Sequence, residues 1–177
     1  MAKMELTEAL KVLDRNHYLA ESAGVREATY EEFLQAFDDV VQNEINLYYK
    51  DYTEEQKEQV YQGFLKEADK IWNMRVHAYT TDGTDSLVLT PNNDGSNYVY
   101  SMYIKPEKRD GTAAIALFRQ ALKDSPNGMS FHTHKGNKLA RAAVRLGFKE
   151  YPSSNPHEIF MANKEGIGGN EYWANED

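Results

Sequence analysis

The sequence contains no cysteine among its 177 residues. This absence excludes disulfide bonds, zinc sites with thiolate ligands and cysteine nucleophiles, although it fixes no cellular compartment. No stretch approaches the roughly 20 apolar residues of a membrane-spanning helix, and the N-terminus lacks the apolar core of a signal peptide. We therefore expect a soluble protein without a membrane partner, and a cytoplasmic location is the default.

What is present is typical of a folded domain. Apolar residues make up 41% of the chain, aromatic residues 12% and charged residues 27%, which is too apolar for a disordered protein. The length suits one ordinary domain, or a small domain with an extension, and leaves no room for two independent enzyme domains.

The charge is unevenly distributed along the chain. Residues 1–72 hold 16 acidic and 8 basic side chains, whereas residues 73–177 hold 12 of each, so the net charge of -8 belongs to the N-terminal part. Residues 105–149 contain ten Lys and Arg against three acidic residues. This segment is expected to attract anions, or to form solvated helix surfaces. The acidic balance of the whole chain and the lack of a recognisable motif argue against nucleic-acid binding.

The first 72 residues repeat apolar side chains at helical spacing in three places. The three groups are Leu6, Ala9, Leu10 and Leu13; Phe33, Leu34, Phe37, Val40 and Val41; and Val60, Phe64, Leu65, Ala68 and Ile71. Thr29 with Glu32 has the spacing of a capping box at the start of the second helix. Thr53 with Gln56 has the same spacing at the start of the third. The pattern predicts three amphipathic helices.

From residue 76 the apolar pattern changes to period two. It predicts strands near 76–79, 87–89 and 98–104, joined as an antiparallel meander with a hairpin turn at Asp82 and Gly83. A helix at 112–123, a strand at 129–134, a helix at 138–146 and strands near 148–151 and 159–162 follow. Alternating strands and helices imply parallel pairing at the centre, so the fold class is α/β with a mixed sheet. No convincing first strand is visible, and Tyr100 and Tyr103 are expected on opposite faces of the central strand.

These elements suggest three regions. A helical N-terminal region covers residues 1–74, a mixed-sheet core covers residues 75–162, and a loose tail covers residues 163–177.

Residues 103–122 carry the most informative pattern. A strand ends at Pro106, a polar loop contains Lys108, Arg109, Asp110 and Gly111, and the small residues Thr112, Ala113 and Ala114 open an amphipathic helix. Free amides and the positive end of a helix dipole can hold a phosphate or pyrophosphate, and small residues let it approach the backbone. An ordinary helix start packed against a sheet explains the same pattern equally well.

At this point the chain resembles the GNAT superfamily of N-acetyltransferases. The layout of Ile104-Lys105-Pro106, then Arg109-Asp110-Gly111-Thr112-Ala113-Ala114 with Leu117-Phe118, is similar to the family's central motif, with Thr112 where a glycine is usual. Residues 137–148 look like the family's Asn-x-x-Ala helix that ends in Gly-Phe. The resemblance spans about residues 75–162 and implies a GNAT-like acyltransferase fold with a helical N-terminal extension.

The resemblance further implies that acetyl-CoA is the co-substrate. Its pantetheine arm would pair with the central strand near Met102 and Ile104, its pyrophosphate would lie on Arg109, Asp110, Gly111, Thr112, Ala113 and Ala114, and Asn137 would hydrogen-bond the arm. An amine, from a small molecule or a protein, would attack the thioester directly. The acidic N-terminal helices would favour a cationic amine.

The sequence departs from the family at the leaving group. Many members carry a tyrosine acid at the position of Ala143. The remaining candidates for moving protons are His132 and His134, which lie two residues apart on one strand and share a face, although both could be ordinary surface imidazoles. A metal site is not expected, because no third ligand has suitable spacing.

Two functions therefore stay open. The first is an acetyl-CoA-dependent N-acetyltransferase. The second is a non-catalytic GNAT-like scaffold or assembly protein, such as a viral one, that binds a protein partner or forms an oligomer through its N-terminal helices.

Overall fold

The computed structural model describes residues 24–168. Its elements are β1 (Arg26–Glu27), α3 (Tyr30–Tyr48), α4 (Glu54–Met74), β2 (His77–Thr80), β3 (Ser86–Pro91), β4 (Asn97–Tyr103), the 3-10 helix η1 (Pro106–Lys108), α5 (Thr112–Lys123), β5 (Met129–His134), α6 (Lys138–Arg145), β6 (Lys149–Pro152) and β7 (Glu158–Ala162). The first predicted helix and most of the predicted tail lie outside the described residues. No helix within residues 24–168 is long and apolar enough to cross a membrane.

The two capping boxes predicted from the sequence are present. Thr29 accepts a hydrogen bond from the amide of Glu32 and starts α3, and Thr53 accepts one from the amide of Gln56 and starts α4. In each box the third helical residue also accepts from the backbone amide of the cap, so two amides without helical partners are satisfied. The starts of both helices are therefore fixed locally.

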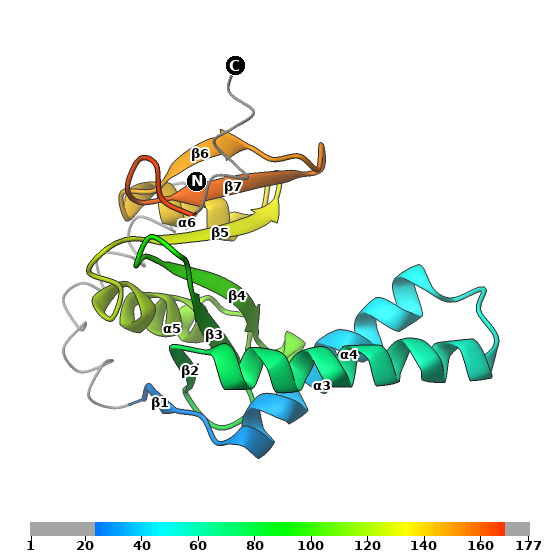
Figure 1. Ribbon diagram of the computed structural model, residues 1–177. Helices are drawn as coiled ribbons and strands as arrows, with labels where there is room; N and C mark the ends of the chain where they lie inside the picture. The colour runs from blue at the N-terminus through cyan, green and yellow to red at the C-terminus, as the bar shows by residue number, and fades with distance from the viewer. Residues whose placement is uncertain (1–23, 169–177) are drawn as a thin grey trace.

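The strands form one seven-stranded mixed sheet in the order β1-β2-β3-β4-β5-β7-β6 (Figure 1). β2, β3 and β4 make the predicted antiparallel meander, and β4 pairs with β5 in parallel. β7 lies between β5 and β6 and is antiparallel to both. The predicted parallel pairing at the centre is thus confirmed, and it is limited to one pair of strands.

The sequence analysis missed the first strand. β1 consists of Arg26 and Glu27, which pair with Thr80 and Tyr79 at the edge of the sheet. Two exposed charged residues carry no period-two apolar signal, so only the partner strand defines this element.

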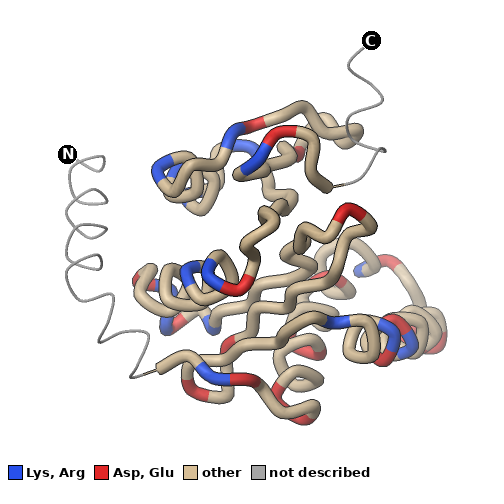
Figure 2. Tube along the Cα trace, turned by 60° about the vertical axis from the view of Figure 1, so that its left-hand side comes forward, with Lys and Arg blue, Asp and Glu red and all other residues tan. Residues whose placement is uncertain are grey.

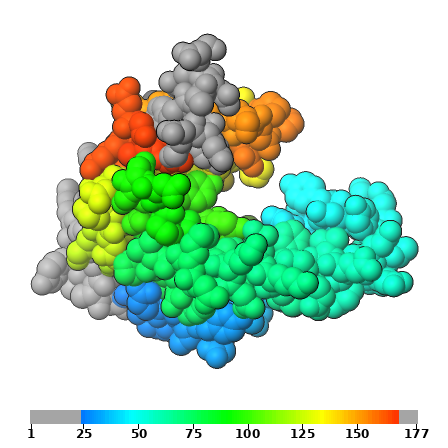
Figure 3. All heavy atoms as spheres, viewed as in Figure 1, coloured from blue at the N-terminus to red at the C-terminus, as the bar shows by residue number. Residues whose placement is uncertain are grey.

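Two layers of helices cover the sheet. The side chains of α3 and α4 pack with Ala78 and Val88 on one face. α5 and α6 pack on the other face, where Leu117, Phe118 and Ala143 meet Phe131 and other strand residues. Beyond this core, α3 and α4 project as an arm whose exposed residues include Leu47, Tyr48 and Tyr52 (Figures 1 and 3).

A β-bulge in β4 overturns one expectation from the sequence. Val88 is in register with Ser101 and Leu89 with Val99, so Tyr100 has no partner across the β3–β4 pair. The extra residue reverses the alternation of side chains after it. Tyr100 and Tyr103 therefore both face α3 and α4, instead of lying on opposite faces.

The first residues of the predicted tail pack against the sheet. The side chain of Asn163 accepts the amide of Met129, and the amide of Gly168 donates to Asp94. Ile167 is buried against Phe160. Residues 163–168 are thus part of the folded body.

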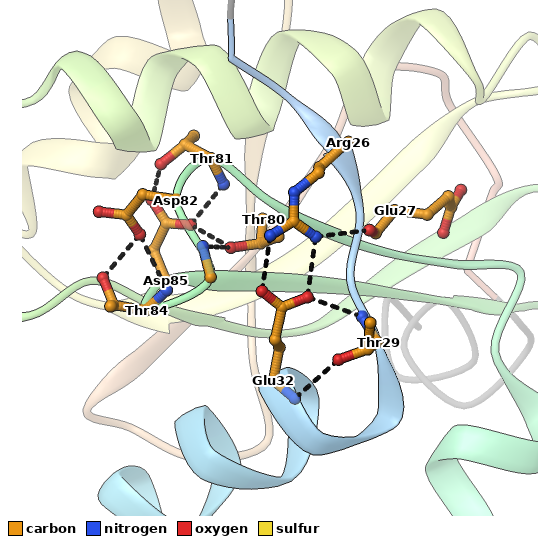
Figure 4. A network of polar contacts seen from close by, with 10 residues as sticks. Arg26, Glu27, Thr29, Glu32, Thr80, Thr81, Asp82, Thr84 and Asp85 are labelled. Carbon is orange, nitrogen blue, oxygen red and sulfur yellow. Dashed lines mark hydrogen bonds and ion pairs between the residues drawn. The ribbon is translucent and has the colours of Figure 1, made fainter.

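The turn between β2 and β3 is held by a buried carboxylate (Figure 4). Asp85 is 1% exposed and accepts hydrogen bonds from the Thr80 hydroxyl at 2.9 Å and the Thr81 amide at 2.6 Å, as well as from the Thr81 hydroxyl. The Thr80 hydroxyl in turn accepts the amide of Gly83. These hydrogen bonds fix the hairpin turn, whose Asp82 pairs with Lys108 in the loop before α5.

We expect Asp85→Ala to lower the free energy of unfolding by about 2–4 kcal/mol, because it leaves buried donors without an acceptor. Urea denaturation monitored by circular dichroism measures this change. Asp51→Ala, an exposed acidic residue in the tip of the arm, is the control and should change stability by less than about 0.5 kcal/mol. Equal stability of the two variants would contradict the structural role of Asp85.

Candidate functional site

The central feature is an opening between β4 and β5. The two strands are in register at only two positions, Asn97 with Met129 and Tyr98 with Ser130. Beyond these residues the strands part, on the side from which the α3–α4 arm projects (Figure 1). Figure 3 shows a hollow between the β5–β7 part and this arm. Met102 and Ile104 follow the paired part of β4, whose edge toward β5 has no further strand partner within residues 24–168.

The loop after β4 ends at a helix start with small residues. Gly111 caps α5 with a φ of 92°, a left-handed conformation that glycine adopts without strain. The first helical bond runs from the amide of Ile115 to the carbonyl of Gly111, so the amides of Thr112, Ala113 and Ala114 have no acceptor within the helix. A Cβ built on Gly111 meets nothing within 4 Å. The loop is open enough to accept a phosphate group.

The charges around this loop differ from the simple count along the sequence. Asp110 accepts the Thr112 amide at 2.9 Å, so a carboxylate already occupies one of the three amides. Lys108 forms an ion pair with Asp82 of the β2–β3 turn, and this interaction holds the pKa of Asp82 well below its usual range. Arg109 donates from Nε to the carbonyl of Ile104 at 2.8 Å. Two of the predicted basic groups are therefore partly engaged by the protein itself.

Further basic residues lie on the helices. Figure 2 shows Lys and Arg on α5 and around α6, and those of α5, Arg119 and Lys123, lie in its C-terminal half, away from the helix start. Asn137, predicted to bind the cofactor arm, caps α6 through a bond of 2.9 Å from the Leu139 amide to its side-chain oxygen. The backbone amide of Asn137 donates to the carbonyl of His134, the last residue of β5, at 3.2 Å.

The position of the missing tyrosine is internal. Ala143 is fully buried and packs in the cluster that contains Phe118 and Phe148. A side chain at this position of α6 points into the core, so no acid can act from there in this chain.

His132 is half-buried on β5 and interacts with a residue of β4. Its Nδ1 lies 2.7 Å from the hydroxyl of Tyr98, and its ring is 5.1 Å from that of Phe160. Burial lowers the pKa of His132, and Glu158 acts against this change. The imidazole is therefore held toward its neutral form. His134, by contrast, is exposed at the end of β5 and in register with Glu158.

Carboxylates of the helical arm surround the tyrosines of β4. Partial burial and the charges of Glu67 and Glu44 raise the pKa of Tyr100. Burial and a contact with Asp39 raise that of Tyr103. The face of β4 toward α3 and α4 thus combines aromatic rings with negative charge, an environment that favours cations.

Tyr98 is the main residue that the sequence analysis missed. Plain alternation along β4 places Tyr98 on the same face as Tyr100, but it does not show which residue of another strand lies opposite. Its bond to His132 depends on where β4 and β5 meet, which no local pattern encodes. Within residues 24–168, no three His, Asp or Glu side chains gather in a way that could hold a metal ion.

Comparison with known proteins shows the fold. No protein-family model and no curated protein sequence matches the chain. Among solved structures, it is similar to the PaiA N-acetyltransferase of Thermoplasma acidophilum, solved with coenzyme A, with a TM-score of 0.54 and 17% identity over 79% of this chain and 97% of that one. It is also similar to Ard1 of Thermoplasma volcanium, with a TM-score of 0.51 and 15% identity over 79% and 95%. The GNAT-like fold predicted from the sequence is confirmed.

Removing the charge of Asp110 tests whether the loop before α5 binds the phosphates of coenzyme A. Asp110→Asn keeps an oxygen that can accept the Thr112 amide but removes the negative charge, so we expect coenzyme A to bind about three- to tenfold more tightly. Isothermal titration calorimetry at low salt measures the change, which should shrink as salt is added. Asp124→Asn, which removes a carboxylate at the other end of α5, is the control. Unchanged affinity in Asp110→Asn would place the phosphates elsewhere.

Proposed function

Because the chain folds like GNAT N-acetyltransferases, we propose that it transfers an acetyl group from acetyl-CoA to an amine. One observation carries the proposal. β4 and β5 part after two paired residues, and β4, which borders the opening, leads through a short loop to the start of α5, where the amides of Ala113 and Ala114 have no acceptor within the helix. This arrangement suits a long ligand with an extended arm and a phosphate end.

The proposed binding residues follow from this geometry. The edge of β4 at Met102 and Ile104 supplies backbone groups for an extended arm. Arg109, Gly111, Thr112, Ala113 and Ala114 supply charge and amides for the pyrophosphate, beside the carboxylate of Asp110. Asn137 caps α6 with its oxygen and can donate from its amide nitrogen to the arm.

The reaction needs little covalent chemistry from the protein. Acetyl-CoA supplies an activated carbonyl: the amine nitrogen bonds to the carbonyl carbon, the carbon–sulfur bond breaks with its electron pair going to sulfur, nitrogen loses a proton to water, and sulfur gains one. The protein contributes proximity, orientation and a donor for the developing negative charge. We assign that donor role to His132, because it lies where the strands part and burial favours its neutral form.

The acceptor is proposed to be an amine that is cationic when it binds and whose nitrogen gives a first proton to water before it attacks the carbonyl carbon. Residues 30–74, which contain α3 and α4, carry 11 acidic and 4 basic residues. Glu44 and Glu67 of this arm lie near Tyr100 on the face of β4 next to the opening. A positively charged substrate would be drawn to this surface and would meet aromatic rings there.

The first test is binding of acetyl-CoA. Acetyl-CoA at about 100 times its dissociation constant should add about 2.7 kcal/mol of stability, which a thermal-shift assay detects. Gly111→Val should weaken binding at least tenfold, because it adds bulk in the loop. Since valine is also strained at a φ of 92°, Gly166→Val is the matched control: Gly166 has a φ of 78° and equally open surroundings, but lies far from the loop in sequence. A similar loss in both variants would point to backbone strain alone.

The second test concerns the histidines. Removing one donor to a developing oxyanion typically lowers kcat by about 100- to 1,000-fold, so His132→Ala should reduce kcat by at least about 100-fold with little change in KM for acetyl-CoA. His134→Ala and the double variant show whether His134 adds to this effect. Release of free thiol, measured across a panel of amines, follows the reaction. Full activity of the double variant would remove both residues from the mechanism.

The second candidate is a non-catalytic scaffold with this fold. The carboxylate of Asp110 on the Thr112 amide and the pairing of Lys108 with Asp82 favour it, since both reduce the attraction for phosphate. Its interaction surface would be the tip of the arm, where Leu47 is 68% and Tyr48 70% exposed. Binding of acetyl-CoA without transfer to any amine in the panel would favour this function.

A further inference from the structure

Tyr98 and His132 connect the two halves of the sheet at the point where they separate. Tyr98 is the last residue of β4 in register with β5, and its partner there is Ser130. His132 follows Ser130 by two residues, so both project from the same face of β5. The Tyr98 hydroxyl lies 2.7 Å from Nδ1 of His132, and the two rings meet edge to face at 5.8 Å.

We propose that Tyr98 is the positioning residue of His132, donating its hydroxyl proton to Nδ1 and so fixing the imidazole with its proton on Nε2. This inference rests on the proposed acetyl transfer, in which His132 supplies a donor. A tyrosine hydroxyl gives up its proton only near pH 10, so it is the donor to a neutral imidazole. With Nδ1 occupied by this bond, the neutral ring carries its hydrogen on Nε2, which is the state that can donate to developing negative charge.

The surroundings of the imidazole support this assignment. The titratable groups near it within residues 24–168 include Tyr98 on β4, Glu158 on β7 and Tyr151 on β6, which packs against Phe160. Glu158 is in register with His134, not with His132, and favours a charged ring. The effect of burial on the His132 pKa is larger than the opposing effect of Glu158. Tyr98 therefore holds the ring by a direct hydrogen bond at Nδ1, and this bond can select the tautomer.

Ser130 adds an independent sign that this place binds a ligand. Its side chain is fully buried, and its hydroxyl has no hydrogen-bond partner within residues 24–168. A buried hydroxyl without a partner is costly and uncommon in folded proteins. It lies beside Tyr98 in the register of the two strands, so a bound acyl group at this point would have a further donor available.

Tyr98→Phe tests the proposal because it removes only the hydroxyl and keeps the ring against His132. In the ligand-free protein, nitrogen NMR of His132 should show a smaller population of the Nε2-protonated tautomer and a raised imidazole pKa, since the donor that favours the neutral ring is lost. In the transfer assay, kcat should fall about tenfold, and KM for acetyl-CoA should stay within about twofold.

The matched control is Tyr30→Phe. It removes another tyrosine hydroxyl bond of 2.7 Å, to Asp69, between α3 and α4. It should change neither the His132 signals nor kcat. Unchanged tautomer and pKa in Tyr98→Phe would overturn the proposal, and so would an unchanged kcat in a variant whose His132 signals have shifted. The NMR measurement needs no acetyl-CoA, so it separates failure of the Tyr98–His132 interaction from failure of the proposed function, which would appear as absence of transfer by the unmodified protein.

Discussion

The short pairing of β4 with β5 is the constraint on which the rest of the site depends. Each strand is held more extensively by its outer neighbour: β4 is in register with β3 at six positions, and β5 with β7 at five, against two positions between them. The sheet therefore behaves as two sheets joined at one end. Both the backbone edge of β4 and the meeting of Tyr98 with His132 follow from that division.

A sheet that parts at its centre needs another connection to stay folded. Three phenylalanine rings provide it on the face covered by α5 and α6. Phe118 of α5, Phe131 of β5 and Phe148 before β6 lie 5.4 to 5.5 Å from one another. Aromatic contacts of this kind add to the large area that each ring buries. The opening is thus stabilised by packing beneath it, and Ala143 is small because it belongs to this packing.

The features that could be predicted from the sequence are those set by residues close together in the chain. The capping boxes at Thr29 and Thr53, the β2–β3 hairpin and the helix after Gly111 all depend on spacings of a few residues. The bulge at Tyr100 and the two-residue strand β1 are defined by their partner strands. A single inserted residue in β4 was enough to bring Tyr100 and Tyr103 to one face, and no periodicity in the sequence marks it.

The charges around the start of α5 show most clearly what the sequence alone does not predict. The excess of basic residues in 105–149 predicts a segment that attracts anions, yet Lys108 is paired with Asp82, which lies 26 residues earlier in the sequence. Asp82 reaches it because Asp85 and Thr80 fix the hairpin turn. The electrostatic potential at the start of α5 therefore depends on the β2–β3 hairpin, which a count of charged residues along 105–149 does not include. It also depends on Asp110 in the loop itself. Whether phosphate binds there is decided by the competition of a few groups for the same cations and amides, because a surface ion pair is worth little and a phosphate with several charges can displace it.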